Sequence, residues 1–176
     1  VGLLLLTGTP YHTYFQGAQF VHFLLGPATV ALAVPLYHNA GQVRRLLLPL
    51  ALGLVCGSLT AITSAMALTW ALGGSLQTLL SMAPKSVTTP IAMGIVEKIG
   101  GLPSLTAVLV ILTGIVGAAT ASQILGWLRV QDDEVKGFAI GVAAHGIGTA
   151  RAFQISEAAG AFAGLAIGLN ALLTTL

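Results

Sequence analysis

The sequence predicts an all-α fold: a polytopic helical membrane protein, transporter-like, in which several helices are broken. Of its 176 residues, 56% are hydrophobic and only 7% are charged, and the mean hydropathy is +0.94. Soluble domains carry about 25% charged residues. The apolar runs are about 20 residues or longer, which is the length of a membrane-spanning helix and not the ten-residue alternation of outer-membrane barrels. We therefore expect a multi-pass protein whose surroundings are the lipid bilayer.

The same composition argues against several other classes of protein. The net charge is only +2, and no basic stripe interleaves with aromatic residues, so nucleic acid is not an expected partner. The single cysteine, Cys56, excludes a disulfide framework. The histidines show no metal-ligand spacing, and the common hydrolase and nucleotide-binding motifs are missing from the sequence. We expect no metal, no cofactor and no enzymatic activity.

Uninterrupted apolar runs predict three spanning helices. They cover residues 46–72, 103–128 and 157–176. Pro103 favours a helix start at the second of them, and Asp132 is a plausible N-cap for the segment that follows it. Residues 1–6 are too short to span, and we interpret them as the end of a membrane helix that begins earlier.

Three further segments, residues 15–39, 75–99 and 135–153, are interrupted by Pro or Gly. Proline disfavours a continuous helix, and irregular backbone is tolerated at membrane depth only inside protein or beside a cavity. The first two segments share a Pro-x-hydroxyl-Val core. This pattern predicts one membrane domain over residues 1–176 with an inverted repeat of about 10–73 and 74–154, as in secondary transporters. Chance similarity between apolar sequences is the alternative.

Lys85 is the most informative residue, because no other charged residue occurs between Leu46 and Glu97. An ionisable residue at membrane depth costs roughly 2.5–3.5 kcal/mol by insertion scales, so it marks a functional site by default. A half-helix that starts after a break directs free N–H groups and a positive dipole end at the gap, which suits an anion. The alternative is that Lys85 snorkels to an interface, or pairs with Glu97 or a partner subunit.

The third interrupted segment contains His145, Gly146, Gly148 and Arg151. His145 can titrate near neutral pH and could carry a proton for symport, whereas the alternative is a histidine bonded to a carbonyl group. Arg151 is expected nearer the membrane interface. In the last span, Gly160, Gly164 and Gly168 form a small-residue stripe that predicts helix packing and could serve as a subunit contact.

Charge placement gives a prediction of sidedness. If each broken segment crosses the membrane once, one side carries Arg44, Arg45, Glu97, Lys98 and Arg151. The other side then carries Arg129 and the acidic residues 132–134. The positive-inside rule places the first side in the cytoplasm.

The three breaks resemble the signature stretches of the LrgB/CidB (YohK-like) membrane proteins. The similar stretches are Leu24–Tyr37, Pro84–Ala92 and Ala144–Arg151, in the same order and spacing. The resemblance implies a multi-pass protein of the bacterial inner (cytoplasmic) membrane that acts with a small LrgA/CidA-type membrane partner, as a homo-oligomer or hetero-oligomer. Members are described as antiholin-like or holin-like modulators of murein hydrolase activity and cell lysis. Plastid relatives carry glycolate and glycerate, and some bacterial pairs are linked to pyruvate uptake.

Residues and resemblance together favour a membrane carrier for short monocarboxylates such as glycolate, glycerate, pyruvate or lactate. A holin-like or antiholin-like modulator of lysis is the alternative, and an accessory subunit that only scaffolds its partner is a third. The candidate substrate-binding residues are Pro27, Thr29, Pro84, Lys85, Ser86, Thr88, Thr89, His145, Gly146, Gly148 and Thr149, with Arg151 as a further candidate.

Overall fold

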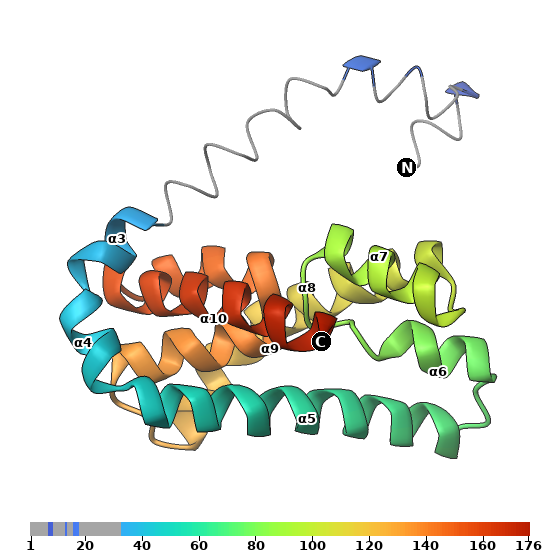
Figure 1. Cartoon of the computed structure of the whole chain (residues 1–176). Coiled ribbons are helices and arrows are strands. Elements are labelled where there is room, and N and C mark those ends of the chain that lie inside the picture. Colours follow the sequence, from blue (N-terminus) through green and yellow to red (C-terminus); the bar gives the residue numbers. More distant parts are fainter. Residues whose placement is uncertain (1–6, 9–12, 14–15, 18–32) are drawn as a thin grey trace. The chain divides into compact units, whose positions relative to one another are not determined.

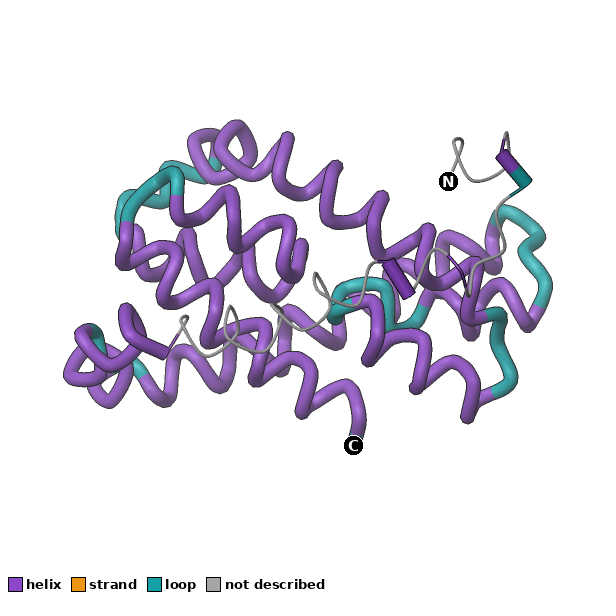
Figure 2. Tube along the Cα trace, turned by 90° about the horizontal axis from the view of Figure 1, so that it is seen from above, coloured by secondary structure: helices purple, strands orange, loops and turns teal. Residues whose placement is uncertain are grey.

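The structure is a computed structural model that describes residues 7–8, 13, 16–17 and 33–176 (Figure 1). The chain divides into two compact units, residues 1–34 and 35–176, and the fold that follows is that of the second unit. Pro27 and Thr29 of the predicted site lie outside the described residues. Within the described part every regular element is an α-helix, and Figure 2 shows these helices joined by short loops. The predicted all-helical class is therefore confirmed.

Among the described residues, three helices are long and apolar enough to span a membrane: α5 (Leu47–Ala71), α8 (Pro103–Trp127) and α10 (Glu157–Thr175). At 1.5 Å per residue, the 25 residues of α5 extend about 37 Å, which exceeds the roughly 30 Å hydrocarbon core of a bilayer. The three predicted spans are thus confirmed to within one residue at each boundary. Two short helices, α3 (Ala33–His38) and α4 (Ala40–Arg45), precede α5.

The direction of the long helices follows from their contacts with the start of α9 (Asp133–Phe153). Gly53 of α5 faces Phe138, and Gly57 faces Val142, so α5 and the beginning of α9 run in the same direction. On α8 the order is reversed, because Gly117 faces Ala144 while Leu125 packs in the cluster of Ile140. The end of α5 and the start of α8 therefore lie at the same end of the bundle.

Residues 72–102 consequently enter and leave at one end. They form α6 (Leu76–Met82) and α7 (Thr89–Ile99), which are too short to span, separated by the non-helical residues 83–88. We name α6, residues 83–88 and α7 the first hairpin. Two hydrogen bonds join the first hairpin to the start of α8. The Leu102 N–H donates to Ser81 Oγ at 2.8 Å, and Thr106 Oγ1 donates to the Ser81 carbonyl at 3.0 Å.

Helix α9 is also folded back on itself. Its backbone is non-helical at Ala144 (φ −125°, ψ 16°) and His145 (φ 41°, ψ −140°). A Cβ built on Gly148 would lie 3.1 Å from the carbonyl oxygen of Ile140, whereas residues eight apart in a straight helix are about 12 Å apart. We name the two arms, residues 133–143 and 146–153 with the turn between them, the second hairpin.

The second hairpin enters and leaves at the end opposite to the first. Gly137 and Gly141 of its first arm lie against Ala159 and Ala163 of α10 in the same order, so α10 starts beside the start of α9. The two hairpins therefore enter from opposite ends of the bundle. Their tips meet near the middle of the spans, since Gly114, close to the midpoint of α8, faces the His145 ring.

The arrangement of a span followed by a hairpin occurs twice in opposite directions, over residues 47–99 and 103–153. These boundaries differ from the predicted repeat of about 10–73 and 74–154. Much of the first predicted half lies outside the described residues, so that repeat stays a prediction.

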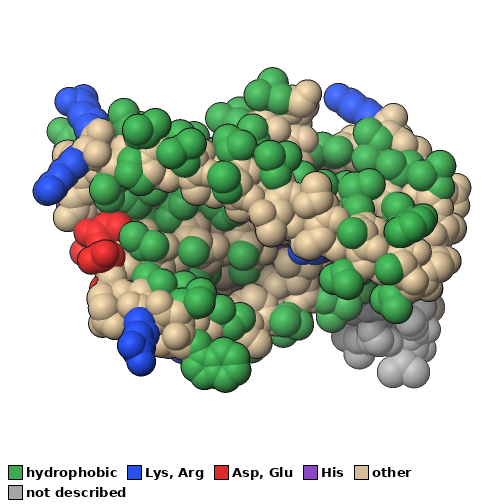
Figure 3. All heavy atoms as spheres, turned by 90° about the horizontal axis from the view of Figure 1, so that it is seen from below, with side chains coloured by type: hydrophobic (Ala, Val, Ile, Leu, Met, Phe, Trp, Pro, Cys, Tyr) green, Lys and Arg blue, Asp and Glu red, His purple; other side chains and the backbone are tan. Residues whose placement is uncertain are grey.

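Charged side chains gather at one end of the described unit. Figure 3 shows blue and red atoms concentrated toward one end of a mostly hydrophobic face. We name the end where α5, α9 and α10 begin the charged end. Five of the seven Lys and Arg residues of the chain lie there: Arg44, Arg45, Arg129, Lys136 and Arg151.

The predicted sidedness is wrong. Arg45 lines the same hollow as Asp132 and Glu134, so these groups share one end of the bundle. The prediction assumed that each broken segment crosses once, whereas the second and third segments return to the end where they entered. Lys98, at the end of α7, lies at the opposite end.

Candidate functional site

The tip of the first hairpin carries five of the predicted site residues. Pro84 and Ser86 are buried, and Lys85, Thr88 and Thr89 are partly exposed. The Lys85 Nζ lies 3.5 Å from Ser86 Oγ, and among the described residues no carboxylate forms an ion pair with this ammonium group. The alternative in which Lys85 pairs with Glu97 therefore has no support within the described part.

Lys85 lines a hollow of about 400 Å³ between the two hairpins. Its walls come from the first hairpin, from α8 and from the first arm of the second hairpin. Apart from the Lys85 ammonium and the Thr113 hydroxyl, the side chains around it are apolar: Met82, Leu109, Leu112, Val116 and Ala143, together with Gly117. Such a hollow offers a small anion one charge and few competing polar groups.

The tip of the second hairpin is built around His145, which is 5% exposed. Its Nε2 lies 2.7 Å from the carbonyl oxygen of Val110, so this nitrogen carries the proton and donates, because a carbonyl can only accept. Thr149 Oγ1 donates to the His145 carbonyl at 3.1 Å. These contacts match the alternative in which His145 is bonded to a carbonyl group.

Glycine permits the close approach of α8 to this tip. A Cβ on Gly114 would lie 2.7 Å from His145 Nε2, and one on Gly117 would lie 2.5 Å from the Cβ of Ala144. Gly148 is crowded as well, at 2.6 Å from Ala144 Cβ, whereas Gly146 has open space around it. Of the two predicted glycines, only Gly148 is required by packing.

Val110 joins the two tips from the side of α8. Its carbonyl accepts from His145, and its side chain packs with Val87 of the first hairpin in one buried cluster. The structure thus brings Lys85, Ser86 and His145 into one region.

Two polar residues of this region were missed by the sequence analysis. Asn170 of α10 is 2% exposed and Ser58 of α5 is 4% exposed. Asn170 Nδ2 donates to the carbonyl oxygens of Ser86 and Val142, each at 3.3 Å, while Ser58 Oγ donates to Asn170 Oδ1. A lone amide in an otherwise apolar span was the available signal, since such side chains usually bond across helices.

Arg151 and Gly160 take part in other contacts. Arg151 Nη2 donates to Ser122 Oγ of α8 at 3.1 Å, and Nη1 donates to Gln154 Oε1 at 2.8 Å, toward the charged end. Gly160 lies directly against the Phe153 ring, so this glycine serves packing within the chain. Gly168 has open space around it.

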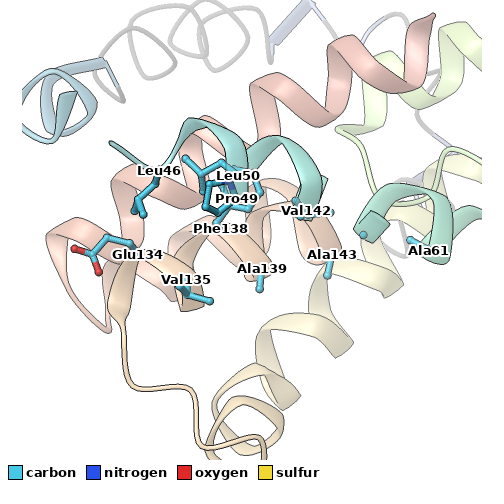
Figure 4. Close-up of a pocket in the computed structure, with 12 residues that line it drawn as sticks. Leu46, Pro49, Leu50, Ala61, Glu134, Val135, Phe138, Ala139, Val142 and Ala143 are labelled. Atoms are coloured by element: carbon cyan, nitrogen blue, oxygen red, sulfur yellow. The ribbon is translucent and has the colours of Figure 1, made fainter. Parts of the chain in front are cut away.

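A second hollow, of about 360 Å³, lies between α5 and the first arm of α9 (Figure 4). Leu50, Phe138, Val142 and other apolar residues line it, and Glu134 stands at one end. Its one charged group is an anion, so this hollow does not suit a small acid.

These features define a class of protein. The described part is a polytopic helical membrane protein in which two hairpins enter from opposite ends and bring polar tips together inside the bundle. Irregular backbone of this kind is tolerated at membrane depth only where protein or a cavity surrounds it.

The chain belongs to the LrgB-like family, whose model matches residues 1–176. It is 39% identical over 176 residues to the uncharacterized protein YwbG of Bacillus subtilis, covering 99% of this chain and 77% of that protein. It is 30% identical over 166 residues to the antiholin-like protein LrgB of Bacillus mycoides, covering 94% of this chain and 72% of that protein. No solved structure matches the chain.

Proposed function

We propose that this protein carries a small carboxylate across the membrane through the junction of its two hairpins. The observation behind the proposal is the Lys85 ammonium, which has no carboxylate partner in the described part and lines the hollow between the hairpins. Discontinuous helices that meet near the bilayer midplane are the binding elements of many secondary transporters. A cation at that depth is costly, so a function that uses it is favoured over an idle charge.

The substrate class follows from the lining of the hollow. One ammonium group balances one carboxylate, and Thr113 supplies a single hydroxyl beside apolar walls. We infer a short monocarboxylate such as pyruvate, lactate, glycolate or glycerate. The Ser86 carbonyl accepts a hydrogen bond from Asn170. Thr88 and Thr89, at the start of α7, remain candidates for contact with the acid.

A second candidate function is an antiholin-like role. It is favoured by the printed names of several Bacillus relatives, and the names of the relatives given above do not mention transport. In this proposal the protein modulates murein hydrolase activity and cell lysis, and its hairpins are structural. Under either function we infer a bacterial inner membrane location and action with a small LrgA/CidA-type partner.

Uptake of labelled pyruvate, lactate and glycolate into proteoliposomes, with and without the partner, tests the first proposal. We expect saturable uptake that falls at least about tenfold in Lys85→Ala, because the ion pair with the carboxylate is lost. Lys98→Ala is the matched control, since Lys98 lies at the far end of α7, away from the tip, and we expect native uptake from it.

The two candidates give different outcomes. If the folded native complex takes up none of these acids, while lysis in cells depends on the protein and is unaffected by Lys85→Ala, the carrier proposal is wrong and the antiholin-like role stands. If uptake is saturable but equal in both lysine variants, the protein is a carrier whose anion site lies elsewhere.

A further inference from the structure

Asn170 is a side chain that hydrogen-bonds to both hairpins. It belongs to α10, and each of its side-chain bonds goes to a different element. Nδ2 donates to the Ser86 carbonyl in the first hairpin and to the Val142 carbonyl in the second, while Oδ1 accepts from Ser58 of α5. At 2% exposure, this amide is shielded from solvent.

The two carbonyl groups need this donor because of the breaks. In a continuous helix the Val142 carbonyl would accept from the N–H four residues later, but Ala144 and His145 are non-helical and interrupt that bond. The Ser86 carbonyl belongs to residues 83–88, outside α6 and α7. Buried carbonyl groups without a partner are costly, so each tip depends on a donor from elsewhere in the protein.

An amide of this size is suited to the position. Asn supplies two donors and one acceptor at the end of a short side chain, which matches two carbonyl groups and one hydroxyl. Aspartate has nearly the same shape but no donor when ionised, and leucine has neither donor nor acceptor. Comparing these side chains separates hydrogen bonding from the filling of space.

We propose that Asn170 is a positioning residue that holds the two hairpin tips in the arrangement seen here. A relative movement of the hairpins stretches or breaks at least one of its two bonds to the tips. Asn170 therefore contributes to the free-energy difference between this arrangement and any other that the hairpins adopt. The consequence for transport, slower exchange between arrangements, rests on the carrier function proposed above.

The test measures the distance between the hairpins directly. In a Cys56→Ser background, spin labels are placed at Gly94 on α7 and at Ala150 on the second arm of α9, both exposed, with open space at Gly94. The distance distribution is then recorded in lipid bilayers by pulsed electron spin resonance. We expect one narrow distribution in the native chain.

The variants are chosen to differ in one property each. Asn170→Asp keeps the shape and, when ionised, removes both donors, so we expect a broader or shifted distribution at pH 8. Burial of the position favours the neutral form of the new carboxyl group, so we expect the distribution to narrow at pH 5, where protonation restores one donor. Asn170→Leu is expected to broaden it at both pH values. Thr174→Val is the matched control one turn further along α10. Its hydroxyl donates to the Asn170 carbonyl of the same helix, so its loss should leave the distribution native.

Native distributions in both Asn170→Asp and Asn170→Leu would overturn the inference. If neither variant folds, Asn170→Ala, which has no side-chain donor or acceptor, is measured, and a distribution as narrow as the native one overturns the inference in the same way. In uptake assays we expect Asn170→Asp to change the maximal rate with little change in KM, because the residue does not line the Lys85 hollow. If the native chain transports none of the acids, the carrier proposal fails, and the distance measurement still decides the role of Asn170.

Discussion

Gly117→Ala is expected to destabilise the fold by crowding α8 against the second hairpin. The new Cβ would lie 2.5 Å from Ala144 Cβ, and ordinary contact begins at 3.4 Å, so the two elements must separate by 0.9 Å. Ala144 Cβ is attached directly to the backbone of the tip and cannot rotate away. Overpacking of this kind costs about 1–3 kcal/mol, and the better helix propensity of Ala returns about 1 kcal/mol.

Gly126→Ala is the matched control on the same helix, because a Cβ there meets nothing within 4 Å. We expect this control to be stabilised by up to about 1 kcal/mol through helix propensity alone. Thermal unfolding of the purified protein in detergent compares the two, with about 2–4 °C of melting temperature per kcal/mol for a chain of this size. If Gly117→Ala melts at or above Gly126→Ala, the close contact between α8 and the tip is refuted.

Three further predictions use the same purified protein. Ser81→Ala removes the hydroxyl that accepts from the Leu102 N–H at the start of α8, while the Thr106 bond to the residue 81 carbonyl is kept. We expect a loss of about 1–3 kcal/mol in unfolding free energy, and an unchanged melting temperature would contradict a stabilising role of the Leu102–Ser81 bond. The pKa of Asp133 lies below its usual value because Lys136 and then Ser156 hydrogen-bond its carboxylate. Its contribution to stability is therefore present above about pH 4, the unfolded pKa, and is lost as pH falls through the folded pKa. The difference in unfolding free energy between the native chain and Asp133→Asn should close in acid, and an unchanged difference would refute this role of Asp133. The positive-inside rule now places the charged end in the cytoplasm. In a Cys56→Ser background, Lys98→Cys should therefore react with an impermeant thiol reagent added to intact cells, whereas Gln131→Cys should not. The reverse labelling pattern would show the opposite topology.

The sequence predicted the parts of the fold that depend on local pattern. The spans at α5, α8 and α10 follow from uninterrupted apolar runs, and the breaks at Pro84 and near His145 follow from proline, glycine and ionisable residues in apolar surroundings. The return of each broken segment to its own end was not predictable from these patterns. A break shows that the helix stops, but the direction that it takes next depends on packing, here the glycine contacts of α9 with α8 and α10.

Of the residues in the candidate site, some could be predicted from the local sequence and others could not. Lys85 stands out in the sequence because its charge is rare at that depth, and the structure places it beside the hollow. Asn170 was missed because its partners are main-chain carbonyl groups 84 and 28 residues away. Only the three-dimensional arrangement reveals that these carbonyl groups are available to accept from a side chain. Polar side chains that serve distant backbone groups leave little signal in a single sequence.

The position of Asn170 also has a consequence for the assembly of the protein during synthesis. The helices of the first hairpin have 7 and 11 residues and the arms of the second are similarly short, so none is long enough for recognition as a spanning segment by the insertion machinery. The amide that completes both tips lies in α10, the last helix to leave the ribosome among those described here. The tips therefore reach their final hydrogen bonding only after α10 enters the bilayer, and truncation before α10 should leave an inserted but unfinished chain that quality-control proteases remove.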